Sequence, residues 1–370
     1  MEARLSMVGR LALILITSWS LGACGRQDTP PSTLLPADFH RGVNYAHIHH
    51  RGRGYGSETS AIELANLRKL GVRWIAITPF GYQRGVTAEE IVGFGNEAAR
   101  KESFSRKDPS LTDRDLSNEV VAAHSLGIKV TLKPHIWSND FWDGKEWQGS
   151  IRQTSPEAHA RWWTSYRAFA LHYARFAEQS HVDMYCIGTE LGFMSVEHPD
   201  EWRALIADIR KTYRGLLTYD GDWGSEFDRV AFWDQLDFIG ISAYFPLDVS
   251  DNASVEQLVT AWKPHRERIA KLANQFKKPV IFLEVGYRAA KGSFRQPSTY
   301  SGGDPDPSAQ ARAYEALFEA LHNEPWWKGA YFWKTFTDPK LVDERGDGED
   351  FSFRGCPAES VLQRWYAEKK

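Results

Sequence analysis

The chain has 370 residues, of which 42% are hydrophobic and 25% are charged. This is a globular composition, which excludes disordered, coiled-coil and collagen-like proteins. Its 45 Lys and Arg residues nearly balance its 48 Asp and Glu residues. The net charge of −3 gives no electrostatic basis for nucleic-acid binding. Tryptophan is frequent, with 15 residues, and its flat apolar ring is suited to stacking on apolar faces.

The first residues have the features of an export signal. Arg4 and Arg10 precede an apolar run at residues 11–21, which is too short to span a bilayer comfortably. The run ends in Leu-Gly-Ala before Cys24. This pattern resembles the bacterial lipobox, in which the cysteine is lipidated and becomes the first residue of the mature chain.

We therefore expect a signal peptide at residues 1–23, a lipidated Cys24 with a flexible proline-containing tether at residues 24–38, and one folded domain at residues 39–370. The alternative is an ordinary signal peptide cleaved nearby, and either one exports the protein from the cytoplasm. The lipobox predicts a location in the bacterial cell envelope, anchored by lipid at the outer membrane and facing the periplasm or the exterior.

From residue 39 onward, short apolar runs alternate with amphipathic helical stretches. The predicted strands are residues 42–47, 72–78, 129–135, 184–190, 216–220, 238–244, 280–284 and 330–333. Parallel strands need helical crossovers, so this alternation predicts a parallel sheet. Eight such units predict a single α/β domain of the (β/α)8 TIM-barrel class.

Two capping patterns and one aromatic stripe mark the predicted helices. Ser60 with Glu63, and Thr112 with Asp115, resemble capping boxes that open helices. Aromatic residues recur at helical spacing between residues 162 and 176, which indicates one face of a helix packed in the core.

Two of the predicted strands end on a glutamate. Residues 184–190 end on Glu190, and residues 280–284 end on Glu284. In a barrel of this type the active site lies at the C-terminal ends of the strands. A carboxylate at the end of a buried strand is costly without a partner or a function. Retaining glycosidases need two carboxyls roughly 5–5.5 Å apart, one as nucleophile and one as acid/base; the structural alternative is a pair of rim salt bridges.

The span from about residue 39 to 366 resembles a clan A glycoside hydrolase, most closely glycoside hydrolase family 113. The stretches that carry the resemblance are GVNYAH at 42–47, LKPH at 132–135, IGTEL at 187–191, DFIGISAYFP at 237–246 and FLEVGY at 282–287. The family consists of β-mannanases built on a (β/α)8 barrel, so the resemblance implies an endo-β-mannanase-like hydrolase.

The resemblance implies a role for individual residues. Glu190 is the expected acid/base and Glu284 the expected nucleophile. Tyr244 is expected to donate its hydroxyl to Glu284, and Trp333 to form the floor of the subsite beside the cleavage point. The other expected substrate-binding residues are Asn44, Lys133, His135, Trp137, Thr189 and Trp223.

The sequence departs from the clan pattern at two positions. The residue before the acid/base is usually Asn, which binds the sugar 2-hydroxyl, but here it is Thr189. The Arg expected near the end of the second strand is also missing, since Ile-Thr-Pro-Phe occupies residues 77–80. These departures bear on the substrate more than on the reaction class, because contacts to the 2-hydroxyl strengthen in the transition state.

Two other functions remain open. A catalytically inactive barrel would bind glycan without cleaving it, since fold alone does not prove activity. A metal-dependent hydrolase is suggested by His47 and His49 after the first strand, but the expected further histidines after strands five and six are lacking. We therefore expect a monomeric, lipid-anchored, retaining β-glycoside hydrolase of a β-1,4-mannan-type polysaccharide, with no cofactor, no metal and no nucleic-acid partner.

Overall fold

The computed structural model describes residues 35–50, 52–94, 111–141, 144–300, 302–340 and 351–367. Every statement about the structure below concerns this part of the chain. Residues 34–370 group into one compact unit by their contacts. The predicted signal peptide, Cys24 and most of the predicted tether lie outside the described residues.

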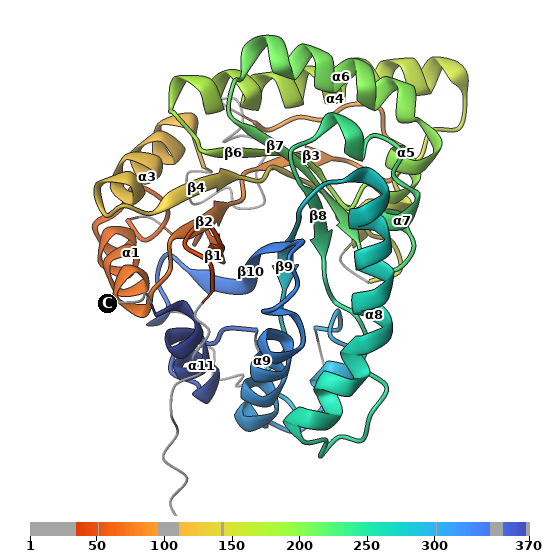
Figure 1. Ribbon diagram of the computed structural model, residues 1–370. Helices are drawn as coiled ribbons and strands as arrows, with labels where there is room; N and C mark the ends of the chain where they lie inside the picture. The colour runs from red at the N-terminus through yellow and green to blue at the C-terminus, as the bar shows by residue number, and fades with distance from the viewer. Residues whose placement is uncertain are drawn as a thin grey trace, which may run out of the picture. The chain divides into compact units, whose positions relative to one another are not determined.

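Eight parallel strands close into a barrel in the order β1, β2, β4, β6, β7, β8, β9, β10, and β10 pairs again with β1 (Figure 1). The strands are β1 (His40–Ala46), β2 (Trp74–Ile77), β4 (Lys129–Leu132), β6 (Met184–Thr189), β7 (Leu216–Asp222), β8 (Ile239–Ser242), β9 (Val280–Val285) and β10 (Trp327–Phe336). Each overlaps one predicted strand, so the predicted (β/α)8 barrel is confirmed for the folded part of the chain.

Helices surround the barrel and connect successive strands (Figure 1). They are α1 (Glu58–Leu70), α3 (Asp113–Ser125), α4 (Pro156–Gln179), α5 (Gly192–Glu197), α6 (Pro199–Thr212), α7 (Glu226–Arg229), α8 (Val255–Phe276), α9 (Pro307–Leu321) and α11 (Pro357–Tyr366). Among the described helices, none combines the length and the apolar character that a bilayer crossing requires.

One of the two predicted capping boxes is correct and the other is wrong. Thr112 caps α3 together with Asp115, and each side chain bonds the backbone of the other residue. Helix α1 instead begins one turn earlier than predicted, because the Ser57 side chain accepts a hydrogen bond from the Ser60 backbone amide. Ser60 is thus inside the helix, where its hydroxyl donates to buried Glu119 at 2.8 Å.

The sequence pattern also missed a second, smaller sheet. Strand β3 (Phe80–Gln83) pairs in parallel with β5 (His135–Ser138), just beyond the C-terminal ends of β2 and β4. Residues 129–135 are predicted as one strand, but β4 ends at Leu132 and β5 begins only at His135. The small sheet extends the barrel wall on the side where the strands end.

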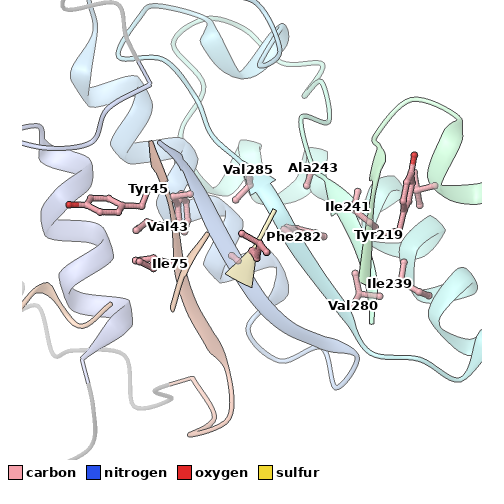
Figure 2. Close-up of a cluster of buried hydrophobic side chains, with 14 of the residues drawn as sticks. Val43, Tyr45, Ile75, Tyr219, Ile239, Ile241, Ala243, Val280, Phe282 and Val285 are labelled. Carbon is pink, nitrogen blue, oxygen red and sulfur yellow. The ribbon is translucent and has the colours of Figure 1, made fainter. Parts of the chain in front are cut away.

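The hydrophobic core has two layers. Between the barrel and the helices lies a continuous layer that includes Val43, Ile75, Ile241 and Phe282 (Figure 2). A smaller cluster fills the barrel interior, with buried members such as Met184 and Leu283. The predicted aromatic face of α4 belongs to the outer layer and is at most 6% exposed from residue 162 to residue 176, so the core-packing interpretation is confirmed.

Candidate active site

Charged side chains from four different strands meet at the C-terminal end of the barrel. Glu284 lies in β9, Asp220 lies in β7, Lys133 directly follows β4, and Glu190 directly follows β6. All these strands run in the same direction, so their C-terminal ends share one rim. The barrel thereby brings together residues that are far apart in the sequence.

Glu284 is surrounded by hydrogen-bond donors. Its Oε2 accepts a hydrogen bond of 2.9 Å from the Tyr244 hydroxyl, which is the contact that the resemblance implies. Its Oε1 is paired with Lys133 Nζ and lies 3.8 Å from His135 Nε2. The carboxylate is only 5% exposed, so these neighbours replace the water that would otherwise stabilise its charge.

Lys133 connects two buried carboxylates. Its side chain is fully buried, and Nζ lies 3.3 Å from Asp220 Oδ2 in addition to its contact with Glu284. Burial lowers the pKa of Lys133, but the two carboxylates outweigh burial and raise its pKa above the ordinary value. Lys133 was expected to bind sugar hydroxyls; its described contacts are instead with these acidic groups and, at 5.4 Å, with the ring of Trp333.

Burial shifts the pKa values of Asp220 and His135 in opposite directions, whereas the Lys133 ammonium lowers both. Burial raises the pKa of Asp220 to about 8 even though Lys133 opposes the shift. Burial and the Lys133 ammonium both lower the pKa of His135, so the imidazole is neutral at neutral pH. A neutral His135 can both donate and accept hydrogen bonds to a ligand.

Glu190 has a different environment, which is rich in carboxylates. Burial raises the pKa of Glu190 well above its ordinary value, and Glu284, Asp222 and Asp220 raise it further. The hydroxyl of Ser242 opposes the shift. A carboxyl in such a place retains its proton at a pH where an ordinary glutamate has lost it.

The backbone of Glu190 is held in an unusual conformation. Its φ is 53°, in the left-handed region, which costs a non-glycine residue on the order of 1 kcal/mol or more. The Glu190 amide donates to the Asp220 carbonyl at 2.8 Å, and the next amide, of Leu191, donates to the Tyr219 hydroxyl at 2.8 Å. These two bonds fix the turn that directs the chain away from β6.

A buried glutamate that the sequence analysis missed supports this turn. Glu226, at the start of α7, accepts hydrogen bonds from the Tyr219 hydroxyl, the Ser195 hydroxyl and the Asp222 amide. Burial raises the pKa of Glu226 to about 7. No strand-end pattern marks this residue, because it follows β7 after a short loop; only the fold shows that it contacts Tyr219 and Ser195.

Asn44 and Thr189 both lie at the barrel rim but differ in their contacts. Asn44 Nδ2 donates to the carbonyls of Leu283 at 2.8 Å and Tyr331 at 3.1 Å, so it links β1 to β9 and β10. Thr189, the last residue of β6, is nearly buried, and its hydroxyl lies 3.9 Å from Cys186 Sγ.

The aromatic residues at this face are divided between the site and the surrounding loops. The ring of Trp333, in β10, lies 6.4 Å from the ring of His135 and nearly parallel to it. Gly286 allows the backbone after β9 to lie close to β10, since a Cβ there would lie 2.5 Å from the Trp333 carbonyl oxygen. Trp137 packs edge-on against Phe141, with ring centres 5.7 Å apart.

Two further tryptophans lie in loops. Trp223, one of the predicted substrate-binding residues, follows β7 and packs against Phe245 with ring centres 6.5 Å apart. Trp147 is 41% exposed.

A cavity of about 550 Å³ is lined by segments that follow β8 and β9, including Pro246, Asp251 and Arg288. Neither Glu190 nor Glu284 is among the residues that line it.

The histidines after β1 do not form a three-ligand group within the described residues. His47 Nδ1 accepts a hydrogen bond of 2.9 Å from the Tyr55 amide. Burial and His49 lower the pKa of His47 to about 3.

In sequence and in fold, the chain is similar to known glycoside hydrolases. The sequence pattern of Glycoside Hydrolase Family 113 matches residues 43–355. The solved structure of the GH113 β-mannanase AaManA from Alicyclobacillus acidocaldarius, in complex with ManMIm, is 28% identical. The alignment covers 89% of this chain and 97% of that one, with a TM-score of 0.75. No curated protein matches the sequence significantly.

Two further structures extend the comparison. A GH113 β-1,4-mannanase solved as a complex is 26% identical over 89% of this chain and 98% of that chain, with a TM-score of 0.74. A Glycoside Hydrolase Family 5 mannosidase from Rhizomucor miehei is 11% identical over 90% and 96%, with a TM-score of 0.55, and is similar in fold alone. The family match covers most of the chain, and the charged residues at the barrel rim lie within it: this protein belongs to Glycoside Hydrolase Family 113 and is a glycoside hydrolase.

Proposed function

We propose that the protein is a retaining β-glycoside hydrolase that cleaves a β-1,4-mannan-type polysaccharide, with Glu190 as acid/base and Glu284 as nucleophile. The observation that supports this assignment is the contrast between two glutamates at one barrel rim. Glu284 is contacted by Lys133 and Tyr244, whereas neighbouring carboxylates and burial raise the pKa of Glu190. Such separation of two carboxyls by environment assigns the acid and the base in known enzymes.

In the first step, the Glu284 carboxylate attacks the anomeric carbon of the bound sugar. A bond forms between that carbon and a Glu284 oxygen while the glycosidic carbon–oxygen bond breaks. Glu190 gives its proton to the departing oxygen, which leaves as an alcohol. The Lys133 and Tyr244 contacts hold the attacking carboxylate in place and stabilise its charge until the new bond forms.

In the second step, the roles of the two residues change. Esterification removes the negative charge of Glu284 and with it one cause of the raised pKa of Glu190. The ionised Glu190 then takes a proton from a water molecule, whose oxygen attacks the anomeric carbon and displaces Glu284. The site returns to its starting protonation state, and the product keeps the β configuration.

The proposed substrate rests on the related structures. The two most similar proteins described above are β-mannanases by their names, one of them specified as β-1,4. Trp333 offers a flat apolar face beside Lys133 and His135, and the C–H faces of sugar rings pack on such surfaces. Thr189 occupies the position before Glu190, which is usually Asn in the clan. Because the Thr side chain is shorter than that of Asn, it makes less direct contact with a sugar 2-hydroxyl.

A panel of polysaccharides, incubated with wild type and Glu284→Ala in parallel, tests the proposal. We expect release of reducing ends from β-1,4-mannan and from few other polymers, with a loss of at least about 10⁴-fold in the variant, as for other catalytic nucleophiles. Equal product from both proteins would contradict the nucleophile assignment. Binding of mannan by the wild type without any cleavage would show instead an inactive glycan-binding barrel.

We also propose that Cys24 anchors the protein to the bacterial cell envelope through lipid, as its sequence context indicates. Such anchoring would hold the enzyme where external polysaccharide reaches it. Cys24→Ser is expected to move the protein from the membrane fraction to the soluble fraction of fractionated cells, and continued membrane association of the variant would contradict the anchor.

A further inference from the structure

A group of three potential metal ligands lies away from the candidate active site, on the outside of the barrel. His159 is on α4, His198 is at the junction of α5 and α6, and Glu201 is in the first turn of α6. One ligand atom from each residue lies within 4.8 Å of the other two. Helices α4 and α6 run side by side here (Figure 1), so the group joins two separate segments of the chain.

The contacts within the group bring nitrogen and oxygen atoms together around one point. His159 Nε2 lies 2.9 Å from Glu201 Oε1. The imidazole rings of His159 and His198 have centroids 4.1 Å apart, at an angle of 48°. His198 and Glu201 are three residues apart at the start of a helix, which places both on the same side of its first turn.

From this arrangement we propose that His159, His198 and Glu201 bind a divalent transition-metal ion, with zinc as the expected occupant. Two imidazoles and one carboxylate are a ligand set suited to zinc, and a water molecule completes a tetrahedral site. The ligands of a tetrahedral zinc ion are roughly 3.4 Å apart, as follows from bonds of about 2.0–2.1 Å. Small side-chain rotations bring the three ligand atoms from their present separations to that distance.

The surroundings of the three residues favour a cation. The side chains of His159 and Glu201 are 22% and 39% exposed, so an ion can reach them from solvent while the rings remain partly packed. In the bound form the metal replaces the proton between His159 Nε2 and Glu201 Oε1.

The position of the site suggests its effect. Helix α5 begins two residues after Glu190 and ends at Glu197, directly before His198, so the chain from the proposed acid/base to α6 passes directly into the metal group. A bound ion would tie the end of this segment to α4. The inferred role is structural, because the three ligands lie outside the barrel rim that carries Glu190 and Glu284.

Sequence analysis did not find this group because its ligands come from two helices that the fold brings together. The spacing of His198 and Glu201 alone is common among exposed helices. The histidines that stand out in the sequence, at residues 47, 49 and 50, are elsewhere in the fold.

Zinc titration of the full protein tests the proposal, with the chain purified without a polyhistidine tag and stripped with a chelator. Calorimetry is expected to show one zinc ion per chain for the wild type. Removing a residue that hydrogen-bonds a metal ligand typically weakens metal binding 10- to 100-fold. Removing a ligand itself, as in His198→Ala, is therefore expected to weaken zinc binding at least about 100-fold. Glu201→Gln provides a second variant if His198→Ala does not fold.

His172→Ala is the matched control. His172 lies on α4, the helix that carries His159, and pairs with Asp113 at 3.1 Å. This pair is not part of a three-ligand group among the described residues. Cys186 and Cys356 are present in every variant, so zinc bound by thiols would appear in all of them. We expect His172→Ala to bind zinc as the wild type does.

Electron paramagnetic resonance of the copper-loaded protein gives a second readout. Hyperfine coupling to two imidazole nitrogens is expected in the wild type and in His172→Ala, and coupling to one in His198→Ala. The proposal is overturned if the wild type binds no zinc in the micromolar range, or if His198→Ala and Glu201→Gln bind it as tightly as the wild type.

Discussion

The ends of β6 and β9 carry the same type of residue in opposite surroundings. At the end of β9, Glu284 faces the ammonium of Lys133 and the hydroxyl of Tyr244. After β6, burial and a set of carboxylates raise the pKa of Glu190. Two chemically identical side chains thus have different neighbours, and such a difference is how one barrel rim can supply both a nucleophile and an acid.

The difference arises from the order of strands around the barrel. Strand β7 lies between β6 and β8, and it contributes Asp220 and Asp222 to the carboxylates around Glu190. Lys133 follows β4 and reaches across the barrel interior to Glu284. Neither neighbourhood is a local property of the segment that carries the glutamate.

After the loss expected for Glu284→Ala, removing the acid from the Glu190 side of this comparison should have the next largest effect. In Glu190→Gln we expect kcat/KM for mannan to fall by about 10²–10⁴-fold, which is the usual contribution of a general acid. Aryl glycosides with good leaving groups need little protonation, so the rate of their first step should fall little in this variant. Stopped-flow release of the aryl group measures that step, and an equal loss for both substrates would contradict the acid assignment.

Removing the positive charge next to Glu284 tests the surroundings of the proposed nucleophile. Lys133→Met leaves Asp220 and Glu284 without their common partner, and breaking a buried ion pair typically costs about 3–5 kcal/mol of the free energy of unfolding. Urea unfolding measures this loss, and kcat is expected to fall in the protein that remains folded.

Lys129→Met is the matched control for this variant. Lys129 is at the opposite end of β4 and is exposed, with its ammonium 5.2 Å from the Trp74 ring. We expect little change in stability or activity. If the two variants lose the same free energy of unfolding and the same kcat, the buried contacts of Lys133 do not stabilise the protein or support its activity.

A smaller effect is expected on the pH dependence of kcat/KM, which reports the surroundings of Glu190. The acid must be protonated, so kcat/KM falls as pH rises through the pKa of Glu190. Asp222 is one of the carboxylates that raise this pKa, so Asp222→Asn should move the basic limb of the profile to lower pH. Asp228→Asn is the control, because Asp228 lies on α7 and is paired with Arg268 of α8. If this variant moved the basic limb by the same amount, the effect would come from the general loss of negative charge.

The barrel and its two strand-end glutamates could be predicted from the sequence for a physical reason. Buried parallel strands are continuous apolar runs, and a run such as residues 280–284 that ends in a carboxylate is visible without any knowledge of the fold. The break between β4 and β5 was missed because the residues on both sides of Lys133 and Pro134 are equally suited to a strand.

Contacts across the barrel could not be predicted in the same way. Lys133 was assigned to sugar binding because its position places it on the catalytic face. Only the closed barrel shows that its side chain turns inward to Asp220 and Glu284. Glu226 likewise reaches Tyr219 through tertiary packing, and no periodicity in the sequence encodes that approach.

The stereochemistry of cleavage tests most directly whether the two glutamates act by double displacement. Proton NMR of a mannan-type oligosaccharide, recorded in the first minutes of hydrolysis, distinguishes the anomers before they interconvert. We predict that the β anomer appears first, because two successive inversions at the anomeric carbon restore its configuration. Initial appearance of the α anomer would mean a single displacement by water and would contradict the role of Glu284 as a nucleophile.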